Sequence, residues 1–173
     1  QIYYGDIWYT QGGALLAPEN GTIDGQDDFD PSKTVVGYTP GTIWQTTVEG
    51  WAADGKIKEA RATGDQTESI VALQNGKIDA FLTDSPVVEN LMKFQPETLK
   101  GLKLCSNYKD TEAEIGRIAP SVKFGNEDFM KDINKVVAEM RDEGVLDQIY
   151  EKYGLDPKLH AITNDQKDNG LNK

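Results

Sequence analysis

Asp84 is the residue whose type and position best fit binding chemistry. It follows the alternating apolar residues Ile78, Ala80 and Leu82, which predict a buried strand. It precedes Ser85-Pro86, a pair typical of the first residues of a helix. In open α/β sheets, ligands bind at the carboxyl ends of strands. Asp84 is therefore a candidate ligand-binding carboxylate, although the same position would also suit an Asp that only caps the following helix.

A second candidate lies at the start of an earlier helix. Pro40-Gly41 turns the chain after a predicted strand over 34–38, and Thr42 can cap a helix that runs towards Trp51. The first N–H groups of a helix lack partners and carry positive dipole character, so an anion is stabilised there. Trp44 and Trp51 lie seven residues apart on one face of this helix, and we expect both to pack in the core.

Alternating strands and helices must position these residues. The order β-α-β-α-β-α-β predicts an α/β fold with a mostly parallel sheet and helices on both faces. Asn126 and Gly144 bound a long amphipathic helix, and a second one ends at Gly154. Residues 156–173 are polar without periodicity, so we expect a loosely held tail in which His160 is solvated. The predicted strands are 15–17, 34–38, 57–62, 78–82, 102–104 and 114–119.

Composition excludes several classes of function. Asp and Glu outnumber Lys and Arg by 29 to 18 in 173 residues, and the resulting charge of −11 argues against nucleic acid and anionic lipid as partners. The acidic loop around Asp24 lacks the closing Glu of a calcium loop. Cys105 is alone, so no intramolecular disulfide can form. No nucleophile elbow, phosphate-binding glycine loop or zinc spacing is present. We therefore expect a binding module without metal or cofactor, and not an enzyme.

Several motifs occur in order along the chain: Tyr9–Leu16, Val36–Thr42, Ala72–Ala80, Asp84–Val87, and Ile133–Lys135 through Glu139–Gly144 to Ile149–Gly154. Together they resemble the amino-acid-binding (family 3 type) extracytoplasmic solute-binding proteins that serve ABC transporters. The resemblance covers residues 9–155 and is specific because of the order and spacing of the motifs.

This resemblance implies a periplasmic-binding-protein-like (type II) fold with two lobes joined by two crossing strands. Residues 1–17 would be a first-lobe remnant with the first crossing strand at Ala14–Ala17, and 18–112 the second α/β lobe. Residues 113–155 would hold the second crossing strand and first-lobe helices, and 156–173 the polar tail. The N-terminal part of the first lobe, which carries the family's carboxylate-binding arginine, has no match in this chain. We expect the helices left uncovered to favour a homodimer.

The resemblance also implies a function and a site. A free amino acid would bind between the lobes, with its ammonium on Asp84 and its carboxylate at Gly41, Thr42 and the backbone N–H of Ile43. Tyr9 would lie near the ligand, or pack in a core. The partners would be membrane permease subunits, and the location the periplasm or, as a lipoprotein, the cell surface. The alternatives are a ligand-sensing domain of a signalling protein and an enzyme such as a cyclic-acid dehydratase.

Overall fold

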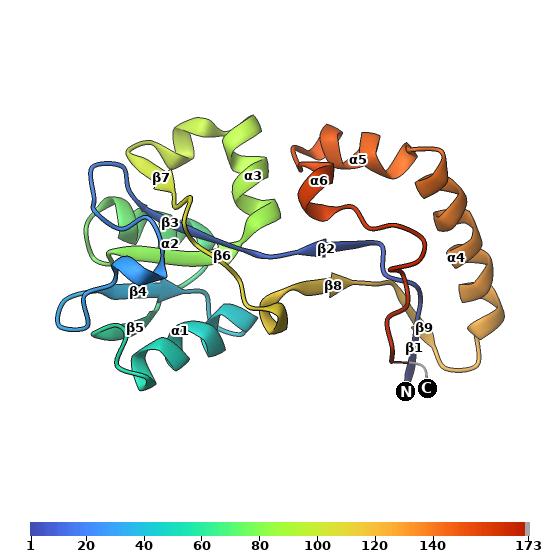
Figure 1. Cartoon of the computed structure of the whole chain (residues 1–173), viewed down its shortest axis with the longest axis horizontal. Coiled ribbons are helices and arrows are strands. Elements are labelled where there is room, and N and C mark those ends of the chain that lie inside the picture. Colours follow the sequence, from blue (N-terminus) through green and yellow to red (C-terminus); the bar gives the residue numbers. More distant parts are fainter. Residues whose placement is uncertain (172–173) are drawn as a thin grey trace. The chain divides into compact units, whose positions relative to one another are not determined.

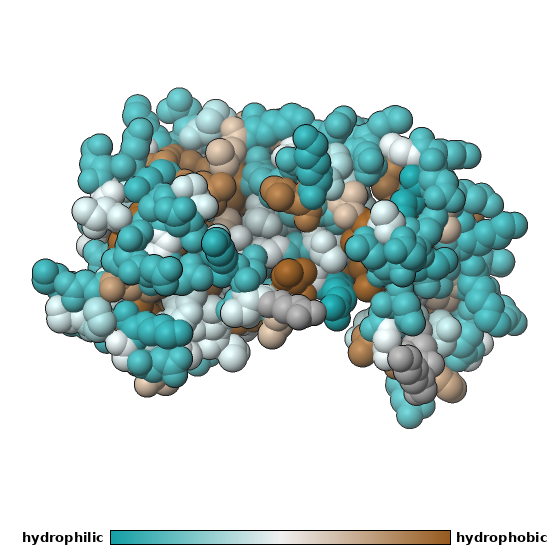
Figure 2. Space-filling view, in the orientation of Figure 1, coloured by the Kyte–Doolittle hydropathy of each residue, from teal (hydrophilic) through white to brown (hydrophobic). Residues whose placement is uncertain are grey.

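The chain folds into two compact units, which the computed structural model describes over residues 1–171. Unit 2 is continuous and comprises Gly12–Glu114, whereas unit 1 combines Gln1–Gln11 with the chain from Ile115 onwards. The backbone therefore passes from one unit to the other twice, at Gln11–Gly12 and at Glu114–Ile115 (Figure 1). Hydrophilic side chains cover most of the face shown in Figure 2, as the composition leads one to expect.

Unit 2 is built on a five-stranded mixed sheet with the strand order β5-β4-β6-β3-β7. β4 pairs in parallel with β5 and β6, whereas β3 runs antiparallel to β6 and β7. Four of the five strands therefore share one direction, and the predicted α/β class is confirmed. The strands are β3 (Gly13–Pro18), β4 (Val35–Tyr38), β5 (Glu59–Ala62), β6 (Ala80–Asp84) and β7 (Leu102–Leu104).

Helices cover both faces of this sheet because the buried strand residues alternate between them. Leu15, Val36 and Leu82 point to the face covered by α1 (Ile43–Ala53), where Trp44 and Val48 complete one core cluster. The opposite face is covered by α2 (Gln66–Gln74) and α3 (Ser85–Phe94), which contribute apolar side chains to a second cluster. That second cluster consists of Ala14, Leu16, Ile70, Leu73, Ile78, Phe81, Val88 and Leu99.

Three short 3₁₀ helices connect the elements of unit 2. They are η1 (Gln26–Asp28), η2 (Pro96–Leu99) and η3 (Glu112–Glu114). The loop before β4 is tied down through Asp24, whose carboxylate accepts hydrogen bonds from the Ser106 hydroxyl at 2.7 Å and the Asn107 amide at 2.9 Å. Asp24 thus has a structural role in joining this loop to the chain after β7.

Unit 1 contains two small antiparallel sheets and three helices. One sheet pairs β1 (Ile2–Tyr4) with β9 (Ser121–Lys123), and the other pairs β2 (Tyr9–Gln11) with β8 (Gly116–Ile118). α4 (Glu127–Asp142) and α5 (Val145–Tyr153) follow, separated by Gly144. The predicted helix ends are confirmed, because Gly144 and Gly154 take φ values of 71° and 90°, in the left-handed region that favours glycine. In the part of the chain that is described, no helix is long and apolar enough to cross a membrane.

The predicted loose tail is wrong for the described residues after Asp156. Pro157–His160 forms a short helix, α6, and His160 is buried at 1% exposure, not solvated. A ring nitrogen of His160, Nδ1, lies 2.8 Å from the carbonyl oxygen of Thr10. Further on, the carbonyl of Lys167 accepts the Ile7 N–H at 2.8 Å. Side-chain and backbone hydrogen bonds therefore hold this segment to the N-terminal residues of unit 1.

The segment expected to be the first crossing strand also differs. Ala14–Ala17 belongs to β3, which lies inside the five-stranded sheet between β6 and β7. β3 is buried on both faces, with Leu15 and Ala17 in one core cluster and Ala14 and Leu16 in the other. The residues that lead into unit 2 are those of β2, whose first residue, Tyr9, is five positions before Ala14.

Candidate functional site

Asp84 ends strand β6 and stands directly before helix α3, as the sequence predicts. Its backbone occupies the N-cap position, but its side chain makes no capping hydrogen bond to the helix. Instead, Asp84 Oδ1 accepts a hydrogen bond of 2.9 Å from the indole Nε1–H of Trp44. The carboxylate is partly exposed and is oriented by a buried aromatic side chain. This geometry does not fit an Asp whose side chain only caps the helix.

Trp44 brings the start of α1 next to Asp84. Its ring is buried in the core, as expected, while the indole N–H reaches the carboxylate. Trp44 is the second residue of α1, so the N-terminus of that helix lies beside the end of β6. Tyrosine and tryptophan combine an apolar body with a polar group that needs a partner when buried. This hydrogen bond was not predicted from the sequence, because it joins residues forty positions apart.

The turn before α1 has the backbone that the sequence predicts. Gly41 adopts a φ of +81°, a conformation that L side chains rarely adopt. Thr42 is the N-cap residue, but its hydroxyl donates back to the Thr39 carbonyl at 2.7 Å and does not bond to the first turn of the helix. Ile43 begins the helix and is 49% exposed. The helix thus presents its N-terminus and one exposed aliphatic residue at this point.

Sheet topology places these two features at one edge. β4 and β6 are parallel neighbours, with Val36 opposite Ala80 and Tyr38 opposite Leu82. The turn after β4 and the end of β6 therefore occupy the same carboxyl edge of the sheet. β4 lies between β5 and β6 in the sheet. The connection that follows β4 leads to β5 on one side of it, and the connection that follows β5 leads to β6 on its other side. Such a switch point is where open α/β sheets bind ligands.

A third group at this edge, centred on Gly13 and Asp110, was missed by the sequence analysis. Gly13 lies opposite Asp84 in the β3–β6 register. The Gly13 N–H donates to both carboxylate oxygens of Asp110, at 3.0 and 2.9 Å, and the Tyr108 hydroxyl donates to Oδ1 at 2.8 Å. A Cβ atom on Gly13 would lie 2.9 Å from Asp110 Oδ1 and 2.9 Å from the Trp44 ring. Gly13 is therefore required by close packing.

The surroundings of Asp110 make its negative charge less favourable than in water. Burial is the main cause that raises the pKa of the Asp110 carboxyl, and the nearby charge of Glu114 adds to it. The hydrogen bonds from Tyr108 and Gly13 oppose this rise. Burial likewise raises the pKa of the Tyr108 hydroxyl well above its usual range, so Tyr108 stays a hydrogen-bond donor.

Tyr9 lies in unit 1, on β2, and so belongs to a different unit from Asp84, Gly41, Thr42 and Ile43. Its ring contacts that of Tyr150, with 6.1 Å between the centroids. The Tyr150 hydroxyl donates to the Trp8 carbonyl at 3.0 Å. Tyr9 therefore packs among the residues of unit 1, and its role towards a ligand stays a prediction.

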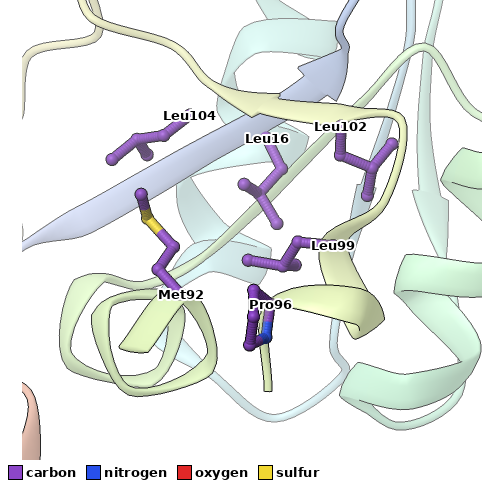
Figure 3. A pocket seen from close by; sticks show the side chains of 6 residues that line it. All are labelled: Leu16, Met92, Pro96, Leu99, Leu102 and Leu104. Carbon is purple, nitrogen blue, oxygen red and sulfur yellow. The ribbon is translucent and has the colours of Figure 1, made fainter. Parts of the chain in front are cut away.

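A separate hollow in unit 2 lacks the groups that an amino acid would need. It has a volume of about 220 Å³ and lies between α3, η2, β3 and β7, with six apolar side chains turned towards one another (Figure 3). Met92 and Leu104 at its rim are partly exposed. An ammonium or carboxylate group buried there would lose its hydration without gaining a partner. The lining residues are Leu16, Met92, Pro96, Leu99, Leu102 and Leu104.

Comparison with known proteins shows the family to which the chain belongs. The profile of the bacterial extracellular solute-binding proteins, family 3, matches residues 32–156. This match covers well over half of the chain, so the chain belongs to that family. Residues 32–156 include Asp84, the turn at Gly41 and Asp110, and leave out β2 and the described segment after Asp156.

Two curated relatives and one solved structure illustrate the similarity. A probable histidine-binding protein of Campylobacter jejuni is 25% identical over 142 residues, which are 82% of this chain and 51% of that protein. The L-cystine-binding protein TcyJ of Escherichia coli is 29% identical over 142 residues, which are 81% of this chain and 48% of that protein. The structure of an ancestral arginine-binding protein bound to arginine is 26% identical, with a TM-score of 0.65, and the match covers 88% of this chain and 64% of the other.

These matches establish the fold as that of the type II periplasmic binding proteins. The chain spans about half the length of the curated relatives that it matches.

Proposed function

We propose that this chain is the substrate-binding component, or part of it, of an ABC-type amino-acid uptake system. The observation that carries the proposal is the Asp84 carboxylate, which Trp44 orients at the carboxyl edge of the sheet beside the N-terminus of α1. Membership of the solute-binding family supports it. One relative is named a probable histidine-binding protein and another an L-cystine-binding protein, and these names support an amino acid as ligand.

The geometry suits the two charges that every free α-amino acid carries. Asp84 would accept hydrogen bonds from the α-ammonium group, and hydrogen bonds between charged groups are stronger than those between neutral ones. The α-carboxylate would lie at Gly41, Thr42 and Ile43, where the first N–H groups of α1 and the helix dipole favour an anion. One ligand would thus bridge the ends of β6 and β4, which are neighbouring strands.

We further propose an extracytoplasmic location and membrane permease subunits as partners, because the family consists of extracellular solute-binding proteins. Binding without turnover fits the site better than catalysis. Asp84 and Asp110 are its acidic groups, and the sole histidine, His160, belongs to unit 1 and lies against β2. A sensor role is distinguished by gene context, because fusion to a membrane-anchored signalling domain would favour it over transport.

The direct test follows the indole N–H signal of Trp44 by NMR while amino acids are added at millimolar concentration. The signal reports on Asp84 because the two groups share a hydrogen bond. We expect a saturable shift for one class of amino acid. Asp84→Asn should weaken binding by about 10-fold or more, because it removes the charge that pairs with the ammonium. The Trp44→Phe variant identifies the signal among the three tryptophans.

Asp54→Asn provides the matched control. Asp54 follows the opposite end of α1 and forms an exposed ion pair with Lys56, so its charge is similar but distant from the site. Binding should be unchanged in this variant. The proposal is contradicted if no amino acid shifts the Trp44 signal, or if Asp84→Asn binds as tightly as the parent chain.

A further inference from the structure

Asp110 places a second carboxylate at the candidate site, close to one edge of the Trp44 ring. The indole Nε1–H of Trp44 donates to Asp84, whereas Cη2 and Cζ3 of the same ring approach Gly13. Gly13 is also the residue whose N–H both oxygens of Asp110 accept. Asp84 and Asp110 therefore border the same indole ring from different sides.

Both carboxylates belong to one face of the sheet. Residues directly opposite each other in an antiparallel pair point to the same face, and Gly13 is opposite Asp84. The position that a Gly13 side chain would take is bordered by Asp110 and Trp44. The absence of a side chain at Gly13 thus lets Asp110 approach the face on which Asp84 lies.

The charges around Asp110 are unbalanced. The charged neighbour that acts on its carboxyl is Glu114, which is itself acidic. Glu114 is held by the Thr47 hydroxyl at 2.9 Å and the Thr111 N–H at 2.6 Å, so its charge is fixed near α1. Asp110 is bound by neutral donors, the Gly13 N–H and the Tyr108 hydroxyl. A positive group placed beside Asp110 would relieve the repulsion between these acids.

We propose that the ligand is an amino acid with a positively charged side chain, and that Asp110 is the residue that selects this charge. The inference rests on the proposed function, since it concerns the same site. Asp84 pairs with the α-ammonium, and Asp110 pairs with the distal ammonium or guanidinium. A neutral side chain of equal length would leave the Asp110 charge unbalanced, and an acidic one would add to the repulsion.

Lysine and norleucine form the matched pair of ligands that tests this inference. Their side chains have the same aliphatic length, and only lysine carries a distal charge. We expect lysine to bind the full chain about 10-fold more tightly than norleucine, measured through the Trp44 indole signal. Lysine should also shift the Gly13 amide signal, because that N–H donates to Asp110. Norleucine should shift the Trp44 signal and leave that of Gly13 nearly unchanged.

The Asp110→Asn variant separates the roles of the two carboxylates. Asparagine keeps an oxygen that can accept from Gly13 and Tyr108 but removes the charge. We expect the preference for lysine over norleucine to disappear in this variant, because the charge that distinguishes the two ligands has been removed. Equal affinity of the parent chain for both ligands, or an unchanged lysine preference in Asp110→Asn, overturns the inference and leaves the proposed function standing. Failure of every amino acid to bind overturns both.

Discussion

Asp84 shows how much of a candidate site one residue's local sequence can reveal. A strand pattern before it and a helix start after it were enough to place it at the carboxyl edge of the sheet, where the structure has it. Its hydrogen bond with Trp44 and the proximity of Asp110 were not predictable in this way. Both depend on the pairing of β3 with β6 and on the packing of α1, and no local pattern encodes such contacts.

The pH dependence of stability is predicted to differ in sign between two aspartates. Burial raises the pKa of Asp110 in the folded chain, so its protonated form favours folding and this contribution is lost as the pH rises through that pKa. We expect Asp110→Asn, compared with the parent chain, to gain relative stability as the pH rises from about 3 to about 6. Urea unfolding at several pH values measures this difference.

Asp24→Asn is the control with the opposite expected sign. The hydrogen bonds from Ser106 hold the pKa of Asp24 below its ordinary value. Its ionised form therefore favours folding, and that contribution is present above the ordinary pKa and lost as the pH falls. The parent chain should gain stability over Asp24→Asn in the same pH range. Equal slopes in the two variants would contradict the opposite pKa shifts of Asp110 and Asp24.

At the scale of elements, the sequence predicts regular structure well and irregular structure poorly. The helices ended by Gly144 and Gly154 and the strands on either side of Asp84 follow from periodicity and from turn residues. The described segment after Asp156 does not, because its anchors are single contacts without a repeat. The Nδ1 atom of His160 meets the Thr10 carbonyl, and the Asn169 amide donates to the Gly5 carbonyl. Such contacts leave no periodic signature in the sequence.

The turn between α4 and α5 offers a test of backbone conformation. Gly144 has a φ of 71°, and a Cβ atom there would meet no neighbouring atom within 4 Å. Any cost of Gly144→Ala therefore comes from the left-handed backbone and not from a clash. We expect a loss of about 1 kcal/mol in the free energy of unfolding, measured by urea titration.

Gly50→Ala is the matched substitution for Gly144→Ala. Gly50 lies inside α1, also with no atom within 4 Å of the added Cβ, and its backbone is helical. Alanine there should stabilise the chain by about 0.5–1 kcal/mol, because glycine is a poor helix former. If both substitutions change stability in the same direction, backbone conformation is not the deciding factor.

At the scale of the whole molecule, the helices of unit 1 carry large apolar side chains that its strands leave exposed. On α4, Phe129 is 61% and Val136 is 53% exposed, and Tyr153 on α5 is 58% exposed. We expect this surface to drive self-association, so that light scattering gives a mass above 19.1 kDa that rises with concentration.

The double variant Phe129→Ser and Val136→Ser should restore the monomer mass, since it removes the exposed apolar groups of α4. Leu104→Ser, which changes an exposed leucine of unit 2, should leave association as it is in the parent chain. A constant mass of one chain at every concentration contradicts the expected homodimer.

The division of the chain has a consequence for its synthesis on the ribosome. Unit 2 is a single uninterrupted stretch, so all of its strands have emerged once Glu114 has left the exit tunnel. Domains generally fold as units, in the order in which they are made. The sheet that carries Asp84 can therefore form early, whereas β1 and β2 must wait, unpaired, until translation delivers β9 and β8. Synthesis therefore completes the sheet of unit 2 before it supplies the strands that close the two sheets of unit 1.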